Sequence, residues 1–363
     1  MSIKNLAIIG AGTMGGGIAI SCLAAGLPTI VIDTNNKSLD ILANRVKAYF
    51  DRQLSKQKIT KEEGDQALSL LRLTTDLSTI GSVELIIEAV FEDLEIKRTL
   101  FSKLKHYLPD STIVATNTSA LRVSDLASSI SNPERFLGLH YFSPAELNPL
   151  VELVKGEETD KTTQERCFKF LEATGKTALK CKDANGFVVN RFFCPFTNEA
   201  VRLHDERIGT TAQIDKVAIK VFDLAIGPFA VMNIIKPRIN LNAINNLSSH
   251  GVFYKPANGM IEMGNSDKSW IIEDNPEKLI SDKVSYIENR LKGALFLPIL
   301  QALSEEITKP SEFDVGAQLA LRFGKPPIQQ MLSIGSEMVV KLVQPYAIKY
   351  NVKNVEKGLS FIF

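Results

Sequence analysis

The stretch that most constrains the fold of this chain is the glycine-rich segment LAIIGAGTMGGGIA, residues 6–19. It places Gly10, Gly12 and Gly15 in the spacing G-x-G-x-x-G, directly after an apolar run and at the start of a helical pattern. Glycines permit a tight turn and the close approach of a pyrophosphate, which the amides and the dipole of the following helix N-terminus stabilise. The segment therefore predicts a strand, a turn and a helix that bind a dinucleotide.

The next β-rich run indicates which dinucleotide is bound. TIVID ends in Asp33, about 20 residues beyond the glycines, where the motif requires an acidic residue. A carboxylate there accepts hydrogen bonds from the ribose hydroxyls and repels a 2′-phosphate, so NAD is favoured over NADP. We assign Thr13 and Met14, between the second and third glycines, to the same cofactor contact.

The pattern of elements changes near residue 183. Before it, short β-rich runs alternate with helical patterns, which predicts an α/β fold with a Rossmann-type doubly wound sheet. After it, long helical segments predict an all-α part. We expect an NAD-binding domain at 1–182, a first helical domain with an Asn- and Gly-rich connector at 183–281, and a second helical repeat at 282–363.

The helical part contains an internal similarity. Residues 183–229 align without a gap on residues 282–328, with eight identities in 47 positions. Both copies have a long helix ending near an acidic pair, an Asp that opens the next helix, and then Gly and Pro residues. We expect an internal duplication; a chance likeness between amphipathic helices is the alternative.

Composition excludes several classes of protein. The formal charge of +1 provides no field that would draw the chain to nucleic acid or to an anionic membrane. Its four cysteines lack metal-site spacing, and we expect no metal. We also expect a reducing, cytoplasmic location and no membrane span.

Two ionisable residues stand at the ends of neighbouring predicted strands. His140 ends RFLGLH, and Glu152 lies within the apolar run PLVELVK, where an unpaired carboxylate would be costly. A carboxylate on one ring nitrogen fixes the tautomer and raises the basicity of the ring, so the other nitrogen can exchange a proton. A structural ion pair is the alternative.

Polar residues also follow the predicted strand STIVA. Asn117 and Ser119 in ATNTSAL come where the carboxyl end of a parallel strand faces the cofactor crevice. Capping of the next helix is the alternative role for this segment, and both roles are compatible.

Five motifs together resemble those of the (S)-3-hydroxyacyl-CoA dehydrogenase family. They are GAGTMGGGIA, VFEDLEIKRTLF, ATNTSAL, GLHYFSPAELNPLVELV and CKDANGFVVNR, and the resemblance runs from about residue 1 to 231. The remaining tail resembles the duplicated helical part of multifunctional β-oxidation enzymes. The resemblance implies NAD-dependent interconversion of a 3-hydroxyacyl-CoA thioester, such as 3-hydroxybutyryl-CoA, and its 3-ketoacyl-CoA.

The resemblance also implies roles for individual residues. His140 is the general acid/base, Glu152 orients it, and Ser119 and Asn190 contact the substrate. The implied cofactor contacts beyond the glycine motif are Glu92, Lys97, Asn117 and Ser143. Lys56 is implied to contact the coenzyme A phosphates, with a solvated surface lysine as the alternative.

Some features leave alternatives open. Ser143 stands where many family members have Asn, and Asn185 replaces a common proline. The Asn190-Arg191 pair recurs as Asn289-Arg290, which indicates a partly structural role. A related dehydrogenase of free hydroxy acids and a non-catalytic NAD-binding protein are the alternative functions. The chain is expected to be a monomer with an internal pseudo-dimer, or a homodimer through another face.

Overall fold

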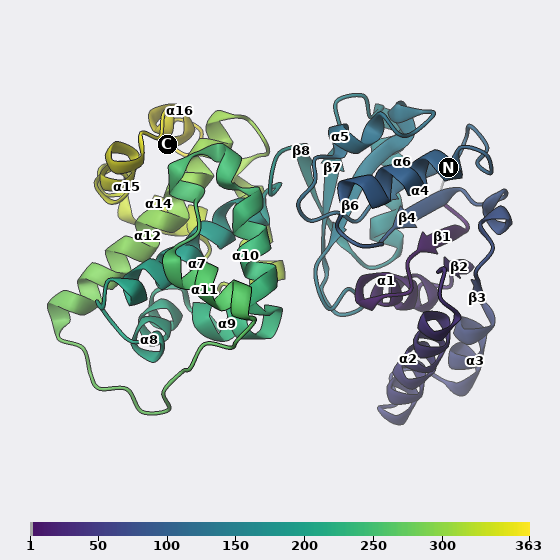
Figure 1. Ribbon diagram of the computed structural model, residues 1–363, viewed down its shortest axis with the longest axis horizontal. Helices are drawn as coiled ribbons and strands as arrows, with labels where there is room; N and C mark the ends of the chain where they lie inside the picture. Colours follow the sequence, from purple (N-terminus) through teal and green to yellow (C-terminus); the bar gives the residue numbers. More distant parts are fainter. Residues whose placement is uncertain (1–2) are drawn as a thin grey trace. The chain divides into compact units, whose positions relative to one another are not determined.

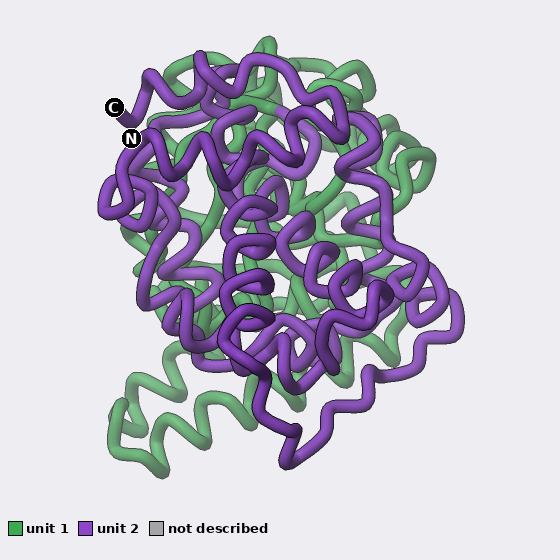
Figure 2. The backbone as a smooth tube through the Cα atoms, turned by 90° about the vertical axis from the view of Figure 1, so that its left-hand side faces the viewer, with its two compact units in different colours: residues 1–183 green, residues 184–363 purple. Residues whose placement is uncertain are grey.

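The computed structural model describes residues 3–363, and its backbone divides into two compact units, residues 1–183 and 184–363 (Figure 2). The first unit is built on one eight-stranded sheet in the order β3-β2-β1-β4-β5-β6-β7-β8 (Figure 1). Its strands are β1 (Leu6–Ile9), β2 (Thr29–Ile32), β3 (Leu71–Thr74), β4 (Leu85–Glu88), β5 (Ile113–Thr116), β6 (Phe136–Tyr141), β7 (Leu150–Lys155) and β8 (Thr177–Lys182).

Neighbouring strands are parallel except for β6 and β7, which run antiparallel. Strand β1 lies between β2 and β4, so the strand order reverses there, and a crevice at the carboxyl ends of these strands is where such sheets bind ligands. Strands β1, β4 and β5 are buried along their whole length, which explains why they read as continuous apolar runs.

Helices connect these strands. They are α1 (Thr13–Ala24), α2 (Asn36–Ser55), α3 (Lys61–Ser69), α4 (Leu94–Leu104), α5 (Val123–Ala127) and α6 (Lys161–Ala173), with 3₁₀ turns at Leu77–Ile80 and Pro133–Arg135. Helix α1 contacts β1 and β2, and α6 contacts β7 and β8. The predicted fold class, a doubly wound α/β sheet followed by helices, is confirmed.

The second unit is helical throughout. Its helices are α7 (Val189–Asp205), α8 (Thr211–Phe222), α9 (Pro228–Ile235), α10 (Pro237–Asn246), α11 (Asn258–Ser266), α12 (Ser281–Ser304), α13 (Pro310–Leu321), α14 (Pro327–Ile334), α15 (Ser336–Tyr350) and α16 (Val355–Leu359), with 3₁₀ turns at Ser248–His250 and Val252–Tyr254. Helices α7 and α12 pack against each other in its interior.

Residues 236–281, rich in Asn and Gly, were expected to form the connector, but residues 237–246 and 258–266 are helical, so that expectation is wrong for these two stretches. Pro237 occupies the first turn of α10, where its missing N–H costs nothing. Leu241 and Ile244, three positions apart, share a face of this helix and are buried. The many Asn and Gly residues in this segment are typical of loops, so the short apolar face did not indicate a helix in the sequence.

Backbone features in the helical unit recur at the spacing of the sequence identities. Helices α8 and α9 begin and end 99 residues before α13 and α14. Three pairs of positions with positive φ recur at the same spacing: Arg207 with Glu306, Asp223 with Arg322, and Lys236 with Gly335.

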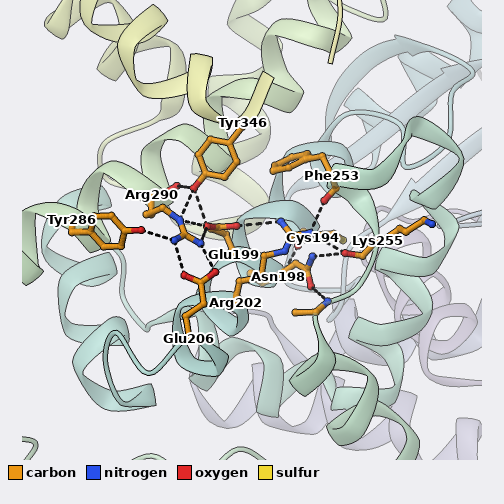
Figure 3. Close-up of polar contacts among 12 residues, drawn as sticks. Cys194, Asn198, Glu199, Arg202, Glu206, Phe253, Lys255, Tyr286, Arg290 and Tyr346 are labelled. Carbon is orange, nitrogen blue, oxygen red and sulfur yellow. Dashed lines mark hydrogen bonds and ion pairs between the residues drawn. The ribbon is translucent and has the colours of Figure 1, made fainter. Parts of the chain in front are cut away.

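Contacts between the two similar segments, 183–229 and 282–328, are reciprocal. Arg191 pairs with Glu305 at 2.7 Å. Its counterpart Arg290 pairs with Glu206 at 2.8 Å, as Figure 3 shows. Leu224 and Phe323, which are also counterparts, form a β-bridge with each other. Equivalent positions meet each other in this way at a twofold interface.

Two further findings bear on the sequence-based expectations. All four cysteines are buried. Among residues 3–363, the helices are too short or too polar to cross a lipid bilayer.

Candidate active site

The antiparallel register of β6 and β7 places His140 directly opposite Glu152. The His140 Nδ1 lies 2.6 Å from a carboxylate oxygen of Glu152, whose side chain is fully buried. Because a carboxylate only accepts hydrogen bonds, the neutral imidazole carries its proton on Nδ1 and keeps Nε2 as the acceptor atom. The pair thus holds one basic ring nitrogen in a fixed orientation.

A second contact holds the strand end that carries His140. Asn117, the residue after β5, accepts a hydrogen bond through Oδ1 from the backbone N–H of Tyr141, at 2.9 Å. Tyr141 follows His140 on β6, so the Asn117 side chain ties the ends of two neighbouring strands together. This gives Asn117 a positioning contact that the sequence did not predict.

The loop that contains Ser119 is organised by Glu92. One Glu92 oxygen accepts hydrogen bonds from the backbone N–H groups of Ser119 (2.8 Å) and Ala120 (3.0 Å) and from the Thr118 hydroxyl. Burial opposes ionisation of Glu92, but Lys97 and these hydrogen bonds outweigh it, so the pKa of Glu92 is lowered. Glu92 is therefore an anion that fixes the loop and leaves Ser119 at an exposed position.

Lys97 also helps to hold the loop that contains Ser119. Its side chain is 1% exposed, and its Nζ lies 2.6 Å from Glu88 and 3.2 Å from Glu92. Glu88, at the end of β4, also accepts hydrogen bonds from the Thr116 hydroxyl and the Val90 N–H. The two ion pairs that Lys97 forms, with Glu88 and with Glu92, thus connect the ends of β4 and β5 to the Ser119 loop.

Glu88 is the residue of this site that sequence reasoning missed. Its signal was present, because ELIIEAV places a carboxylate in a buried apolar run, as PLVELVK does for Glu152. An unpaired carboxylate is costly in either place, so both runs predict a buried partner.

The glycine-rich loop has the geometry that its sequence predicts. Gly10 adopts a left-handed φ of 110°, and a Cβ there would collide with the Ala89 carbonyl. A Cβ on Gly15 would collide with the Gly10 carbonyl. Helix α1 begins at Thr13, followed by Met14, and its N-cap Gly12 offers no side chain to the first amides. These amides are suited to receive phosphate oxygens.

Asp33 stands at the end of β2 beside this loop. Its Oδ2 accepts a hydrogen bond from the Ala11 N–H at 2.8 Å, and its Oδ1 accepts one from the Asn35 N–H at 2.9 Å. Each carboxylate oxygen has a second lone pair, so both remain able to accept from ribose hydroxyls.

The other predicted site residues lie in different surroundings. Ser143 is exposed, just beyond β6. Lys56 is the exposed C-cap of α2. Asn190 is half-buried in the first turn of α7, in the helical unit, and its contribution to the site stays a prediction. Among residues 3–363, no cluster of His, Cys, Asp or Glu is suited to hold a metal.

Comparison with known proteins identifies the family. Residues 5–184 match the NAD binding domain of 3-hydroxyacyl-CoA dehydrogenase, and residues 186–266 match the C-terminal domain of the same family. A 3-hydroxybutyryl-CoA dehydrogenase of Mycobacterium tuberculosis is 34% identical over 236 residues, which cover 64% of this chain and 82% of that one. The chain belongs to the 3-hydroxyacyl-CoA dehydrogenase family. The family predicted from the five motifs is thereby confirmed.

Two further similarities extend over the helical tail of this 3-hydroxyacyl-CoA dehydrogenase family member. The fatty acid oxidation complex subunit alpha of Shewanella oneidensis is 26% identical over 378 residues, covering 96% of this chain and 53% of that protein. A crystal structure of 3-hydroxybutyryl-CoA dehydrogenase from Escherichia coli K12 has a TM-score of 0.88 at 20% identity, covering 99% of both chains. The latter likeness extends the fold to the whole chain.

The position of Asp33 beside the glycine-rich loop predicts that its carboxylate contributes to the affinity for NADH and to the preference for NADH over NADPH. We expect Asp33→Asn to weaken NADH binding about tenfold, because a hydrogen bond to a charged acceptor contributes about 1.5 kcal/mol. The preference for NADH over NADPH should fall at the same time, since the carboxylate no longer repels a 2′-phosphate. Fluorescence titration with both cofactors measures this. Asp40→Asn, an exposed change on α2, is the control, and an unchanged preference in Asp33→Asn would contradict the prediction.

Proposed function

We propose that this protein catalyses the NAD-dependent interconversion of an (S)-3-hydroxyacyl-CoA and the corresponding 3-ketoacyl-CoA, with short acyl chains as the preferred class. The observation that carries the proposal is the His140 ring held at 2.6 Å by a fully buried Glu152. A buried carboxylate paired with a strand-end imidazole is suited to general acid/base work.

In the oxidation, His140 Nε2 removes the proton of the 3-hydroxyl group. Glu152 stabilises the imidazolium that forms, because its carboxylate already accepts the Nδ1 proton. Ser119 and Asn190 hold the reacting oxygen and the thioester, so that the substrate carbon is kept in a near-attack position. NAD, when bound, supplies the acceptor for the hydride that leaves C3.

The residues present fit this cofactor. The crowding around Gly10 and Gly15 excludes side chains from the turn, and the amides at the start of α1 are not capped by Gly12. Glu88, Lys97 and Glu92 hold the loop that carries Ser119 at the carboxyl ends of the strands. Lys97 is buried between two carboxylates, which supports a positioning role in addition to the contact that the resemblance implies.

The test of this function is oxidation of NADH with acetoacetyl-CoA, longer 3-ketoacyl-CoAs and free 3-keto acids in parallel. Turnover with the thioesters supports the proposal. Turnover with the free acids alone supports the related hydroxy-acid dehydrogenase, and NADH binding without any turnover supports a non-catalytic protein. We further propose a cytoplasmic location, which the scattered spacing of the four cysteines supports.

We further propose that the helical unit is an internal duplication, in which residues 282–363 cover a surface that residues 183–281 would otherwise offer to a second subunit. The reciprocal pairs Arg191–Glu305 and Arg290–Glu206 support this, as does the bridge between Leu224 and Phe323. Surfaces that are self-complementary within one chain leave no equivalent surface for a partner.

The duplication predicts a monomer in solution, or a homodimer that forms through a face outside residues 183–231. Light scattering distinguishes the two, since a monomer has the mass of one chain, 40.0 kDa. A dimer whose interface is built from residues 183–231 would overturn the proposal.

A further inference from the structure

A lysine-lined cavity lies within the helical unit, and none of the candidate active-site residues named above lines it. Its volume is about 670 Å³, and it is formed by α8, α12, α14 and the segment 276–279. Pockets of about 300–1,000 Å³ are the usual size for small-molecule sites. Helices α8 and α12, which form two of its walls, pack against each other.

The lining of this cavity combines two kinds of side chain. One set is apolar: Val217, Val221, Leu279, Val284 and Ile334. The other set is five lysines: Lys216, Lys220, Lys278, Lys292 and Lys325. A site with both sets is suited to a ligand that has an apolar body and a strongly anionic head.

The charge of the cavity is positive after its acids are counted. Glu277 and Glu288 also line it, and Glu288 pairs with Lys292 at 2.6 Å. Lys216, Lys220, Lys278 and Lys325 have no ion-pair partner among residues 3–363. Because the whole chain carries a formal charge of only +1, this is a local concentration of positive charge. Lysine ammonium groups bind phosphate as point charges.

The repeat supplies an internal comparison for these lysines. The positions 99 residues away from Lys216, Lys220, Lys292 and Lys325 are Val315, Leu319, Phe193 and Ile226. These four counterparts are all apolar, although Lys216 and Lys220 lie in α8, whose bounds match those of α13 after the shift. The helical fold therefore does not require lysine at these positions.

We infer that this cavity binds a phosphate-bearing amphiphile, with an acyl-CoA thioester as its occupant, at a site separate from that of His140. The phosphates contact the lysines, and the acyl part lies against the apolar side chains. The choice of acyl-CoA within this ligand class rests on the proposed function, whereas the chemistry of the cavity does not.

The test is equilibrium dialysis of the full chain with decanoyl-CoA kept below its micelle concentration. We expect two equivalents bound per chain in the native protein. The variant Lys216→Gln/Lys220→Gln/Lys325→Gln should bind the second equivalent about tenfold more weakly, since each exposed charge contributes roughly a twofold factor. Its dehydrogenase turnover should be unchanged.

The matched control is Lys268→Gln/Lys309→Gln/Lys341→Gln, three exposed lysines of the same unit that do not line the cavity. It should retain both equivalents. Native binding of decanoyl-CoA that the cavity variant leaves unchanged, or an equal loss in both triple variants, overturns the inference. Equal binding of decanoate or of inorganic phosphate in place of decanoyl-CoA also overturns it, because the two halves of the cavity would then not act together.

These outcomes are independent of the proposed function. Binding is measured without turnover, so a protein that fails to oxidise NADH with thioesters can still lose one equivalent in the cavity variant. The reverse result, turnover with thioesters but one bound equivalent, removes the second site alone.

Discussion

Replacing His140 with glutamine is expected to lower kcat by about 10²–10⁴, which is the usual contribution of a general acid/base. Glutamine is close in size to histidine and retains a polar group that can reach Glu152, so the strand pair β6–β7 should persist. It has no titrating nitrogen that could take the substrate proton. Steady-state oxidation of NADH with acetoacetyl-CoA measures the loss.

Two controls separate chemistry from folding in this experiment. His106→Gln changes another of the four histidines, one that is exposed at the end of α4, and it should turn over like the native protein. NADH affinity of His140→Gln should stay within about twofold of native, because His140 is outside the glycine-rich loop. Turnover retained in His140→Gln would refute the proposed role of the ring.

Glu152 contributes to the same step in a different way. In Glu152→Gln the side-chain amide can donate a hydrogen bond to Nδ1, which favours the tautomer with the proton on Nε2. That tautomer cannot accept the substrate proton, so kcat should fall by about 10² or more although the side-chain volume hardly changes. A structural ion pair alone would instead reduce stability and leave kcat intact.

The sequence was sufficient to predict the sheet and much of the candidate site, because the decisive signals are local. Continuous apolar runs identify strands buried on both faces, and the spacing of Gly10, Gly12 and Gly15 identifies the turn between β1 and α1. His140 and Glu152 are only 12 positions apart, so a single antiparallel turn brings them together.

The features that the sequence did not predict depend on contacts between residues that are far apart in the chain. Glu88 pairs with Lys97 and with Thr116, which lies 28 positions away. Arg290 reaches Glu199 across 91 positions, and Tyr346 reaches it across 147. No periodicity in a helix specifies which buried carboxylate an arginine on another helix will meet, since that choice is made by packing. The repeat indicated two similar copies but not that their arginines exchange partners.

The second large effect, a loss of stability, is expected when the buried Glu199 in the helical unit is replaced. Glu199 is fully buried on α7, and one of its oxygens accepts hydrogen bonds from the Arg290 side chain and from the Tyr346 hydroxyl at 2.8 Å (Figure 3). Its other oxygen accepts one from Arg202 at 3.2 Å. Glu199→Gln removes the negative charge and leaves two guanidinium groups partly buried around a neutral amide. Breaking a buried ion pair in this way should lower the free energy of unfolding by about 3–5 kcal/mol.

Glu206→Gln provides the matched control, because Glu206 also pairs with Arg290, at 2.8 Å, but is 41% exposed. Water can replace the lost contact there, so the expected loss is below about 1 kcal/mol. The chain has a single tryptophan, Trp270, which is buried in the helical unit, so its fluorescence during urea denaturation reports on this unit. This matters because a two-unit protein need not unfold in one step. If Glu199→Gln were no less stable than Glu206→Gln, burial of the Glu199 charge would not determine its contribution to the free energy of unfolding. The ion pairs around Arg290 would then contribute little to the stability of the helical unit.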